Sequence, residues 1–359
     1  MESSFYLPLL KSKAGEFKAL ENLNPKLKRK IVPLFEVTRM EYDHDEDAKP
    51  KTIEDHLQKF CKKVMKSWPD NPMFIDTHMV NTEKADGHTA IEYVYAILAT
   101  KEIYPMPVAY PNSSVEFVES IQSIMLMYDV SEIAIRVSIE DITSPDFENK
   151  LNGILDTLEL SESNCHIILD LKDADFSQTD DFAEGIIEAL NDFPYFKNWK
   201  TFTLAGGAFP GMGKIKTEIE LVPRNDWKLF KAVTVGLKKT AFNRPINFGD
   251  YSIVSAGYFE FDPKIMSISA NIRYTHNDMW FVIKGKALKK RPDWLQYYGQ
   301  AETIVKSKYY LGENFSFGDG HLRKCASRLT TTGNPNVWIQ MGTNHHFTKV
   351  LTDLFAKSA

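Results

Sequence analysis

Short runs of apolar and β-branched residues recur along the chain, and most of them end at a polar residue. They lie roughly 25 to 45 residues apart, a distance that suits one strand, one helix and the loops between them. Eight runs qualify as predicted strands: Phe5–Leu10, Ile31–Phe35, Met73–Ile75, Met106–Ala109, Ile133–Ile135, His166–Leu169, Thr201–Leu204 and Tyr251–Ser255, the last of which follows Asp250.

The segments between these runs have the apolar spacing of helices. Residues 15–27, for example, carry Phe17, Leu20, Leu23 and Leu27 at intervals of three and four. The predicted helices are 15–27, 53–64, 91–98, 114–127, 146–158, 180–193 and 225–237, with Ser114, Asp180 and Asn225 as N-caps. Strands that alternate with helices indicate a parallel sheet, because parallel strands need crossover connections. We therefore expect an α/β fold, a (β/α)8 TIM-like barrel, over residues 1–257.

The pattern changes in the last hundred residues. Residues 269–275 and 279–284 predict a β-hairpin that turns at His276-Asn277-Asp278, and helices are predicted near 292–307 and 348–357. We expect residues 258–359 to form a C-terminal hairpin-plus-helix extension that packs on the barrel within a single structural unit.

The composition narrows the class of protein. Hydrophobic residues make up 43% and charged residues 25% of the chain, which is enough for a packed core. The net charge is −5 and the pI is about 6.0, which argues against a broad basic footprint but leaves nucleic acid open as a partner. The three cysteines lie far apart, so neither a disulfide framework nor a structural zinc site is expected. With no signal segment and no apolar run long enough to span a membrane, we expect a cytoplasmic protein without a membrane partner.

Candidate chemistry gathers at the strand ends. Barrels of this type keep their active sites at the carboxyl ends of the strands. Large polar residues stand at seven of the eight predicted ends: Lys11, Glu36, Asp76, Tyr110, Arg136, Asp170 and Asp250. Acids and bases that share one cavity perturb each other's pKa values, as catalytic groups do. The alternative is that these residues form a structural ring of salt bridges or start solvated loops.

The acids suggest two kinds of chemistry. Glu36, Asp76 and Asp170 are the catalytic candidates, as general acids and bases or as metal ligands. Carboxylates are ligands that Mg²⁺ prefers, so Mg²⁺ is a candidate cofactor, although the identity of any metal stays open. Lys11, Arg136 and Arg273 would bind an anionic group, and Tyr110 and Asp250 are further candidate ligand-binding residues. Arg273, Tyr274 and His345 could close the site from the C-terminal extension.

Several of these segments, taken in order, resemble the phage-encoded "beta protein" family. The opening Tyr6-Leu7-Pro8-Leu9-Leu10-Lys11-Ser12-Lys13-Ala14-Gly15-Glu16 is the most specific piece, and the resemblance covers nearly the whole chain. The other pieces are Ala19-Leu20, Ile31-Val32-Pro33-Leu34-Phe35-Glu36, Phe74-Ile75-Asp76, Ile168-Leu169-Asp170, Phe248-Gly249-Asp250-Tyr251, Ile272-Arg273-Tyr274-Thr275 and Trp338…Gly342…His345-His346. The resemblance implies an accessory protein of phages or of antiviral defence, and it adds Lys13 and Tyr251 to the candidate ligand-binding residues.

Two functions remain in view. The first is a barrel that binds a small anionic ligand, such as a nucleotide or phosphoester, at the carboxyl ends of its strands and hydrolyses it. The second is a non-catalytic module that binds protein or nucleic acid in phage–host conflict. The sequence leaves open whether the chain is an enzyme, and a barrel fold alone does not decide it.

Overall fold

Eight parallel strands close into a barrel in the computed structural model, which describes residues 3–40, 52–257 and 268–355. Around the ring the strands follow one another in the order β1-β11-β9-β8-β7-β6-β3-β2. Their bounds are β1 (Tyr6–Leu10), β2 (Leu34–Glu36), β3 (Phe74–Asp76), β6 (Met106–Ala109), β7 (Ile133–Val137), β8 (Cys165–Asp170), β9 (Thr201–Gly206) and β11 (Asn247–Asp250). The predicted (β/α)8 barrel is confirmed.

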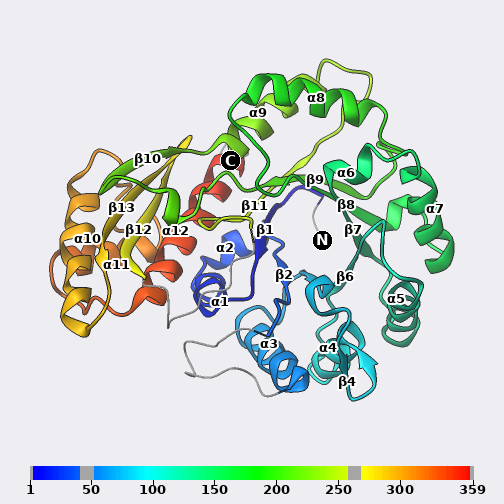
Figure 1. Cartoon of the computed structure of the whole chain (residues 1–359), viewed down its shortest axis with the longest axis horizontal. Coiled ribbons are helices and arrows are strands. Elements are labelled where there is room, and N and C mark those ends of the chain that lie inside the picture. Colours follow the sequence, from blue (N-terminus) through cyan, green and yellow to red (C-terminus); the bar gives the residue numbers. More distant parts are fainter. Residues whose placement is uncertain (1–2, 41–51, 258–267, 356–359) are drawn as a thin grey trace. The chain divides into compact units, whose positions relative to one another are not determined.

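The helices that follow the strands lie on the outside of the ring, as Figure 1 shows. They are α3 (Ile53–Ser67), α4 (Ala90–Ala99), α5 (Val115–Tyr128), α7 (Phe147–Leu158), α8 (Thr179–Asn191) and α9 (Asn225–Leu237), while the short α6 (Ile139–Ile142) lies in the loop between β7 and α7. A small hairpin, β4 (Lys84–Ala85) with β5 (His88–Thr89), precedes α4, and short 3-10 turns η1 (His78–Val80) and η2 (Glu162–Asn164) lie in the loops.

Burial explains why these segments form barrel strands. Every residue of β1, β7, β8 and β9 is buried, as expected for parallel strands that are covered on both faces. The ring closes where β11 pairs with both β1 and β9. Gly249 lies in that strand, and a Cβ atom there would come within 2.9 Å of the Ala205 Cβ. The last strand therefore needs a residue without a side chain at this position.

Some local predictions are wrong. The eighth strand is Asn247–Asp250, and residues 251–255, where we expected it, form turns. Ser114 caps α5 by accepting a hydrogen bond from the Phe117 N–H, as expected, but Asp180 lies inside α8, whose N-cap is Gln178. The predicted helix 15–27 is two helices: the first ends at Glu21 with Asn22 as its C-cap, and the second starts at Pro25 with Asn24 as its N-cap.

The chain divides into two compact units. The first contains the barrel and comprises Met1–Ser12, Val32–Gly207 and Asn225–Asp250, and the second comprises Lys13–Ile31, Ala208–Arg224 and Tyr251–Ala359. We expected an extension built from residues 258–359, and the second unit also takes in segments from the first half and the middle of the chain.

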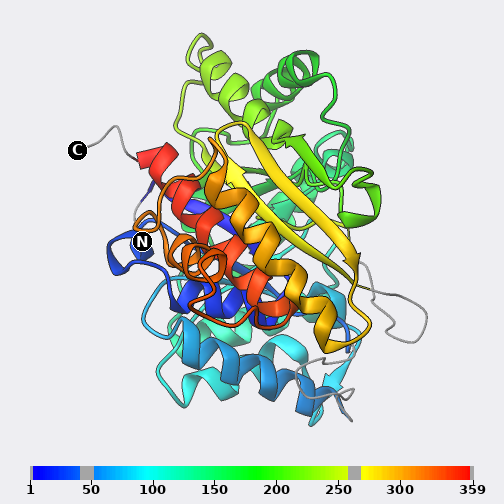
Figure 2. The ribbon, with the colours of Figure 1, turned by 90° about the vertical axis from the view of Figure 1, so that its left-hand side faces the viewer.

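The second unit is built on a three-stranded antiparallel sheet in the order β10-β13-β12. The predicted hairpin is confirmed as β12 (Ser269–His276) and β13 (Met279–Ala287), and β10 (Ile219–Pro223), which we did not predict, pairs with β13. In Figure 2 the helix α10 lies across these strands. The remaining elements are α1 (Ala14–Glu21), α2 (Pro25–Lys28), η3 (Met212–Lys214), η4 (Arg291–Leu295), α10 (Gln296–Lys306), α11 (Phe317–Ala326) and α12 (Pro335–Phe355).

Two helices of this unit differ from expectation. The last helix was predicted near 348–357, but α12 already begins at Pro335, and α11 was missed. Residues 341–351 of α12 are all buried although many are polar, so the helix lacks the alternation of apolar and polar faces by which a helix is recognised. In the described part of the chain, no helix is long and apolar enough to cross a bilayer.

Candidate functional site

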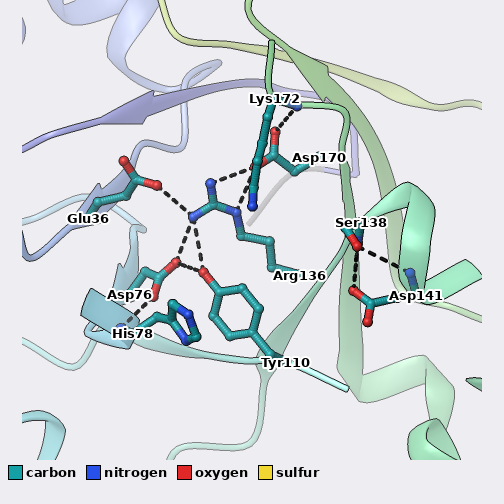
Figure 3. Close-up of polar contacts among 9 residues, drawn as sticks. All are labelled: Glu36, Asp76, His78, Tyr110, Arg136, Ser138, Asp141, Asp170 and Lys172. Carbon is teal, nitrogen blue, oxygen red and sulfur yellow. Dashed lines mark hydrogen bonds and ion pairs between the residues drawn. The ribbon is translucent and has the colours of Figure 1, made fainter. Parts of the chain in front are cut away.

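The carboxyl ends of four barrel strands bring three acids to one arginine. Glu36 and Asp76 are the last residues of β2 and β3 and pair in register, and Asp170 is the last residue of β8. Arg136 lies in β7, which pairs with β8. Figure 3 shows all three carboxyl groups pointing toward the Arg136 guanidinium.

The guanidinium of Arg136 donates to all three acids. Its Nη1 lies 2.7 Å from Oε1 of Glu36 and 2.7 Å from Oδ2 of Asp76. Its Nε and Nη2 lie 3.1 and 2.6 Å from Oδ2 of Asp170. The arginine is only 5% exposed, and each of the three acids is 4% exposed or less. Since burying an unpaired charge is costly, the cluster is held together by its own ion pairs.

Asp76 and Asp170 are oriented by the same local turn. Oδ1 of Asp76 accepts a 2.9 Å hydrogen bond from the backbone N–H of His78, and Oδ1 of Asp170 accepts one of the same length from Lys172. In both cases the other carboxylate oxygen faces Arg136. Bonds from an acid to the backbone two residues on are typical of Asx turns, so the strand ends themselves aim these two carboxylates.

Tyr110 completes the contacts of Asp76. Its hydroxyl donates to Oδ2 of Asp76 and accepts from Nη1 of Arg136 at 3.2 Å. Burial raises the pKa of Tyr110 more than the charge of Arg136 lowers it, so the hydroxyl keeps its proton and acts as the donor. The ring of His78 lies against that of Tyr110, with 4.4 Å between the centroids (Figure 3).

Glu36 differs from the two aspartates. One of its oxygens accepts from Arg136, but Oε2 is buried and has no hydrogen-bond partner. Burial raises the pKa of Glu36, and the neighbouring Asp76 raises it further, against the opposing effect of Arg136. The raised pKa favours the protonated form of Glu36.

These residues line a cavity of about 330 Å³ at the carboxyl end of the barrel. That volume lies in the range of small-molecule sites. Beyond the Arg136 cluster, the wall includes His78, Met79, Asn112, Val137, Ser138, Glu140, Asp141 and Lys172. Asp141 and Ser138 form a capping box at the start of α6, so this part of the wall is also held by hydrogen bonds.

The three acids of the cluster face the Arg136 guanidinium, and this arrangement affects the expectation that they hold Mg²⁺. Over residues 3–40, 52–257 and 268–355, no three His, Cys, Asp or Glu side chains are grouped so that they could hold a metal ion. The donor set fits the binding of Arg136 better than a metal centre.

The other predicted site residues lie elsewhere. Lys11 is buried just after β1, and Asp250, at the end of β11, accepts a 2.5 Å hydrogen bond from the Tyr6 hydroxyl; neither lines the cavity. Lys13, Tyr251, Arg273, Tyr274 and His345 belong to the second unit.

Within that unit, Tyr274 and His345 converge on a buried acid, Asp319. The Tyr274 hydroxyl donates to Oδ1 of Asp319 at 2.7 Å, and Nδ1 of His345 lies 2.7 Å from Oδ2. Arg273 instead donates to the Ile253 carbonyl, and burial lowers its pKa to about 10.

Three further residues of the cavity wall, Lys172, Ser138 and Asp141, carry a signal in the sequence. Asp76-Thr77-His78 and Asp170-Leu171-Lys172 repeat an acid followed by a base two residues on, each after a predicted strand. Ser138-Ile139-Glu140-Asp141 has the spacing of a capping box. Lys172, Ser138 and Asp141 are not among the residues predicted above, because each reads as part of the loop that follows its strand.

The fold and this cavity define the class of the protein, a closed parallel α/β barrel with a charged hollow at the carboxyl ends of its strands. The family model described as Beta protein matches residues 6–352, and the chain belongs to this family. A comparison with curated proteins found no match.

Proposed function

We propose that the mouth of the barrel binds a small polar molecule and that Glu36 exchanges a proton with it. The observation that carries the proposal is the buried Oε2 atom of Glu36, which has no protein partner in a cluster whose other acids are fully engaged. A carboxyl group with a raised pKa exchanges a proton closer to neutral pH, as general acid–base catalysis requires.

In this proposal Arg136 positions the catalytic acid and does not itself bind the ligand. The sequence suggested Arg136 as an anion-binding residue, but its guanidinium already donates to three carboxylates and Tyr110. Asp76 and Asp170 hold the guanidinium in place, so that Glu36 keeps one oxygen for the ligand.

The charged residues that line the cavity indicate how a ligand would be oriented in it. Five acids and three bases, among them His78, line the cavity, and the acids include all three that contact Arg136. The inner end therefore favours a neutral or positively charged group that donates a hydrogen bond to Glu36. Lys172 is exposed and suits a negative group at the outer end, and the His78–Tyr110 pair offers a face for a planar ring. A nucleotide combines these features, so the anionic ligand expected from the sequence remains our candidate.

If protonated Glu36 gives its proton to the leaving atom at the inner end of the ligand while a water molecule attacks the other side of the bond that breaks, the reaction is a hydrolysis. A ligand that is bound but not converted would instead leave the barrel as a binding module. The cytoplasmic location and the association with phages or antiviral defence belong to the same proposal and rest on the sequence and the family resemblance.

Thermal unfolding with a ligand panel tests the proposal. Wild type, Glu36→Gln and Asp170→Asn are melted with nucleosides and with mono-, di-, tri- and cyclic nucleotides, each with and without Mg²⁺ and Mn²⁺. A ligand that binds the folded state raises the midpoint by mass action. The matched control is Glu184→Gln, on the exposed surface of α8.

We expect wild type and Glu184→Gln to be stabilised by the same ligand and to convert it, as followed by chromatography. Glu36→Gln should bind that ligand and convert it at least about a hundredfold more slowly, the usual contribution of a general acid or base. If no member of the panel shifts the wild type, or if Glu36→Gln converts the ligand at the wild-type rate, the proposal fails. A shift without conversion in the wild type would favour the non-catalytic alternative.

A further inference from the structure

The net charge of −5 conceals a strong separation of charge between the two units. The barrel unit holds 20 Lys and Arg against 36 Asp and Glu, a net charge of −16. The second unit holds 23 Lys and Arg against 12 Asp and Glu, a net charge of +11. Charge asymmetry of this kind within one chain is typical of proteins that bind an anionic polymer or surface.

Exposed cations of the second unit gather on the helix pair α10 and α11. Lys306 ends α10, Arg323 and Lys324 lie in the last turn of α11, and Arg328 follows it; all four are exposed. Lys306 pairs with Glu302 and Arg323 with Glu313, so the surface keeps a net positive charge after these two ion pairs are counted. We call these four residues, together with Tyr298, the α10–α11 basic surface. The two helices pack on each other (Figure 2).

An aromatic ring lies among these charges. The Arg328 guanidinium carbon lies 5.8 Å from the centre of the Tyr298 ring, and the Tyr298 hydroxyl donates to the Thr330 carbonyl. These contacts join the start of α10 to the loop that follows α11. A guanidinium beside an aromatic ring suits a nucleic-acid strand, since bases stack on rings while arginine binds phosphate.

The loop after α11 adds groups that bind phosphate. Residues 327–334 read Ser-Arg-Leu-Thr-Thr-Thr-Gly-Asn, and φ is positive at Arg328 (57°) and Gly333 (61°). Hydroxyl groups, backbone N–H groups and arginine make most protein contacts with phosphates and sugars. Ser327, Arg328 and Thr331 are exposed.

The same helices fit a membrane surface poorly. Helices that lie on a membrane expose an apolar face. The apolar residues of α10 and α11, including Tyr297, Ile304 and Leu322, are instead buried in the core of the second unit with Trp338. The exposed face of the pair is therefore polar and basic, although Phe317 and Leu329 are exposed near it.

We propose that the second unit binds nucleic acid through the α10–α11 basic surface, mainly by contacts with the phosphate backbone. The negative charge of the barrel unit repels nucleic acid, which confines binding to the basic unit. This inference does not depend on the chemistry of the barrel mouth.

Fluorescence anisotropy of the full chain tests the inference. The probes are a fluorescein-labelled 30-nucleotide RNA of mixed sequence, the DNA strand of the same sequence and its duplex. The variant carries Lys306→Gln, Lys324→Gln and Arg328→Gln. The matched control, Lys62→Gln, Lys66→Gln and Lys101→Gln, removes three exposed lysines from the barrel unit. Circular dichroism checks that both variants are folded.

We expect the wild type and the control to bind at least one probe with equal affinity, and the basic-surface variant to bind it at least about tenfold more weakly. The slope of the logarithm of affinity against the logarithm of salt concentration should flatten by about 2, because three phosphate contacts are lost. The inference is overturned if no probe binds the wild type at low salt. It is also overturned if both variants bind like the wild type, or if phosphatidylserine vesicles bind and no nucleic acid does.

Discussion

Each unit of this chain buries a cluster of acids and bases, and the two clusters differ in how completely their polar atoms are paired. In the second unit, Asp319 accepts from Tyr274, His345 and Ser316, and Nε2 of His345 lies 2.7 Å from the Thr275 carbonyl. Both ring nitrogens of His345 therefore have a hydrogen-bond partner. In the barrel, three acids surround Arg136, and one oxygen of Glu36 is left without a partner.

This difference in pairing distinguishes a cluster with a structural role, around Asp319, from one with a functional role, around Arg136. Buried polar groups are normally paired, so an exception calls for an explanation such as a ligand. The Asp319 cluster has no such exception and lies in the core of its unit, whereas the exception at Glu36 opens into a cavity. The following changes test this comparison, beginning with the largest expected effect.

Replacing the central cation of the barrel cluster should have the largest effect. Arg136→Met leaves three buried acids without their counter-charge, and we expect it to lower the free energy of unfolding by about 3–5 kcal/mol. Urea denaturation measures this change. Arg136→Lys keeps the charge but not the planar fork, so its loss should be smaller. Equal stability of wild type and Arg136→Met would show that the cluster does not hold the mouth together.

Removing the acid of the second cluster should cost less. Asp319→Asn weakens three hydrogen bonds to a charged group, and we expect a loss of about 2–3 kcal/mol at pH 7. Burial acts to raise the pKa of Asp319, but His345 and the hydrogen bonds outweigh it and lower the pKa. The stabilisation is thus present above the ordinary aspartate pKa of about 3.9 and is lost as the pH falls through the lower folded-state pKa.

Urea denaturation of Asp319→Asn from pH 7 to pH 3 measures this loss, with Asp173→Asn as the exposed control. The gap between wild type and Asp319→Asn should narrow as the pH falls toward the lower end of that range. A gap that stays constant with pH would mean that the carboxylate charge contributes nothing to stability.

Neutralising Glu36 should have the smallest effect and the opposite sign. Its pKa is raised, so its contribution to stability is present below the ordinary glutamate pKa of about 4.3 and is lost as the pH rises through the folded-state pKa. Glu36→Gln removes a buried charge and should raise the free energy of unfolding at pH 7 by about 1 kcal/mol. The gain should disappear below about pH 4.

Thermal melts at pH 4 and pH 7, with Glu184→Gln as the control, measure the gain. A Glu36→Gln variant that is less stable than wild type at pH 7 would contradict the proposed difference between the two clusters. It would mean that the charge of Glu36 stabilises the fold as that of Asp319 does.

Much of the barrel could be predicted from the sequence, and the strands that were predicted wrongly or missed have a physical explanation. Seven strands stand out because they are short runs of buried, mostly apolar residues. The eighth, Asn247-Phe248-Gly249-Asp250, has no such run because tight packing at Gly249 excludes a side chain. β10 was missed because two of its apolar residues, Ile219 and Leu221, are exposed. They also pair with distant residues of β13, Ile283 and Phe281, some sixty positions further along the chain.

The candidate site could be predicted in part. Glu36, Asp76, Tyr110, Arg136 and Asp170 meet because parallel barrel strands end on the same side, a consequence of the alternating pattern of strands and helices. Arg273, Tyr274 and His345 looked equally polar in the sequence, but they belong to the second unit, and nothing in their local pattern shows which unit they join.

The sequence alone thus determined the barrel and the polar strand ends, because the periodicity of helices and strands and the positions of turn residues depend only on near neighbours in the chain. Only the tertiary structure decided which acid keeps an oxygen unpaired. Hydrogen bonding at Glu36 depends on Arg136, one hundred positions away, and on how Asp76 and Asp170 share that guanidinium. The separation of charge also depends on the tertiary structure, because the net charge of −5 hides it and the division of the chain into two units reveals it.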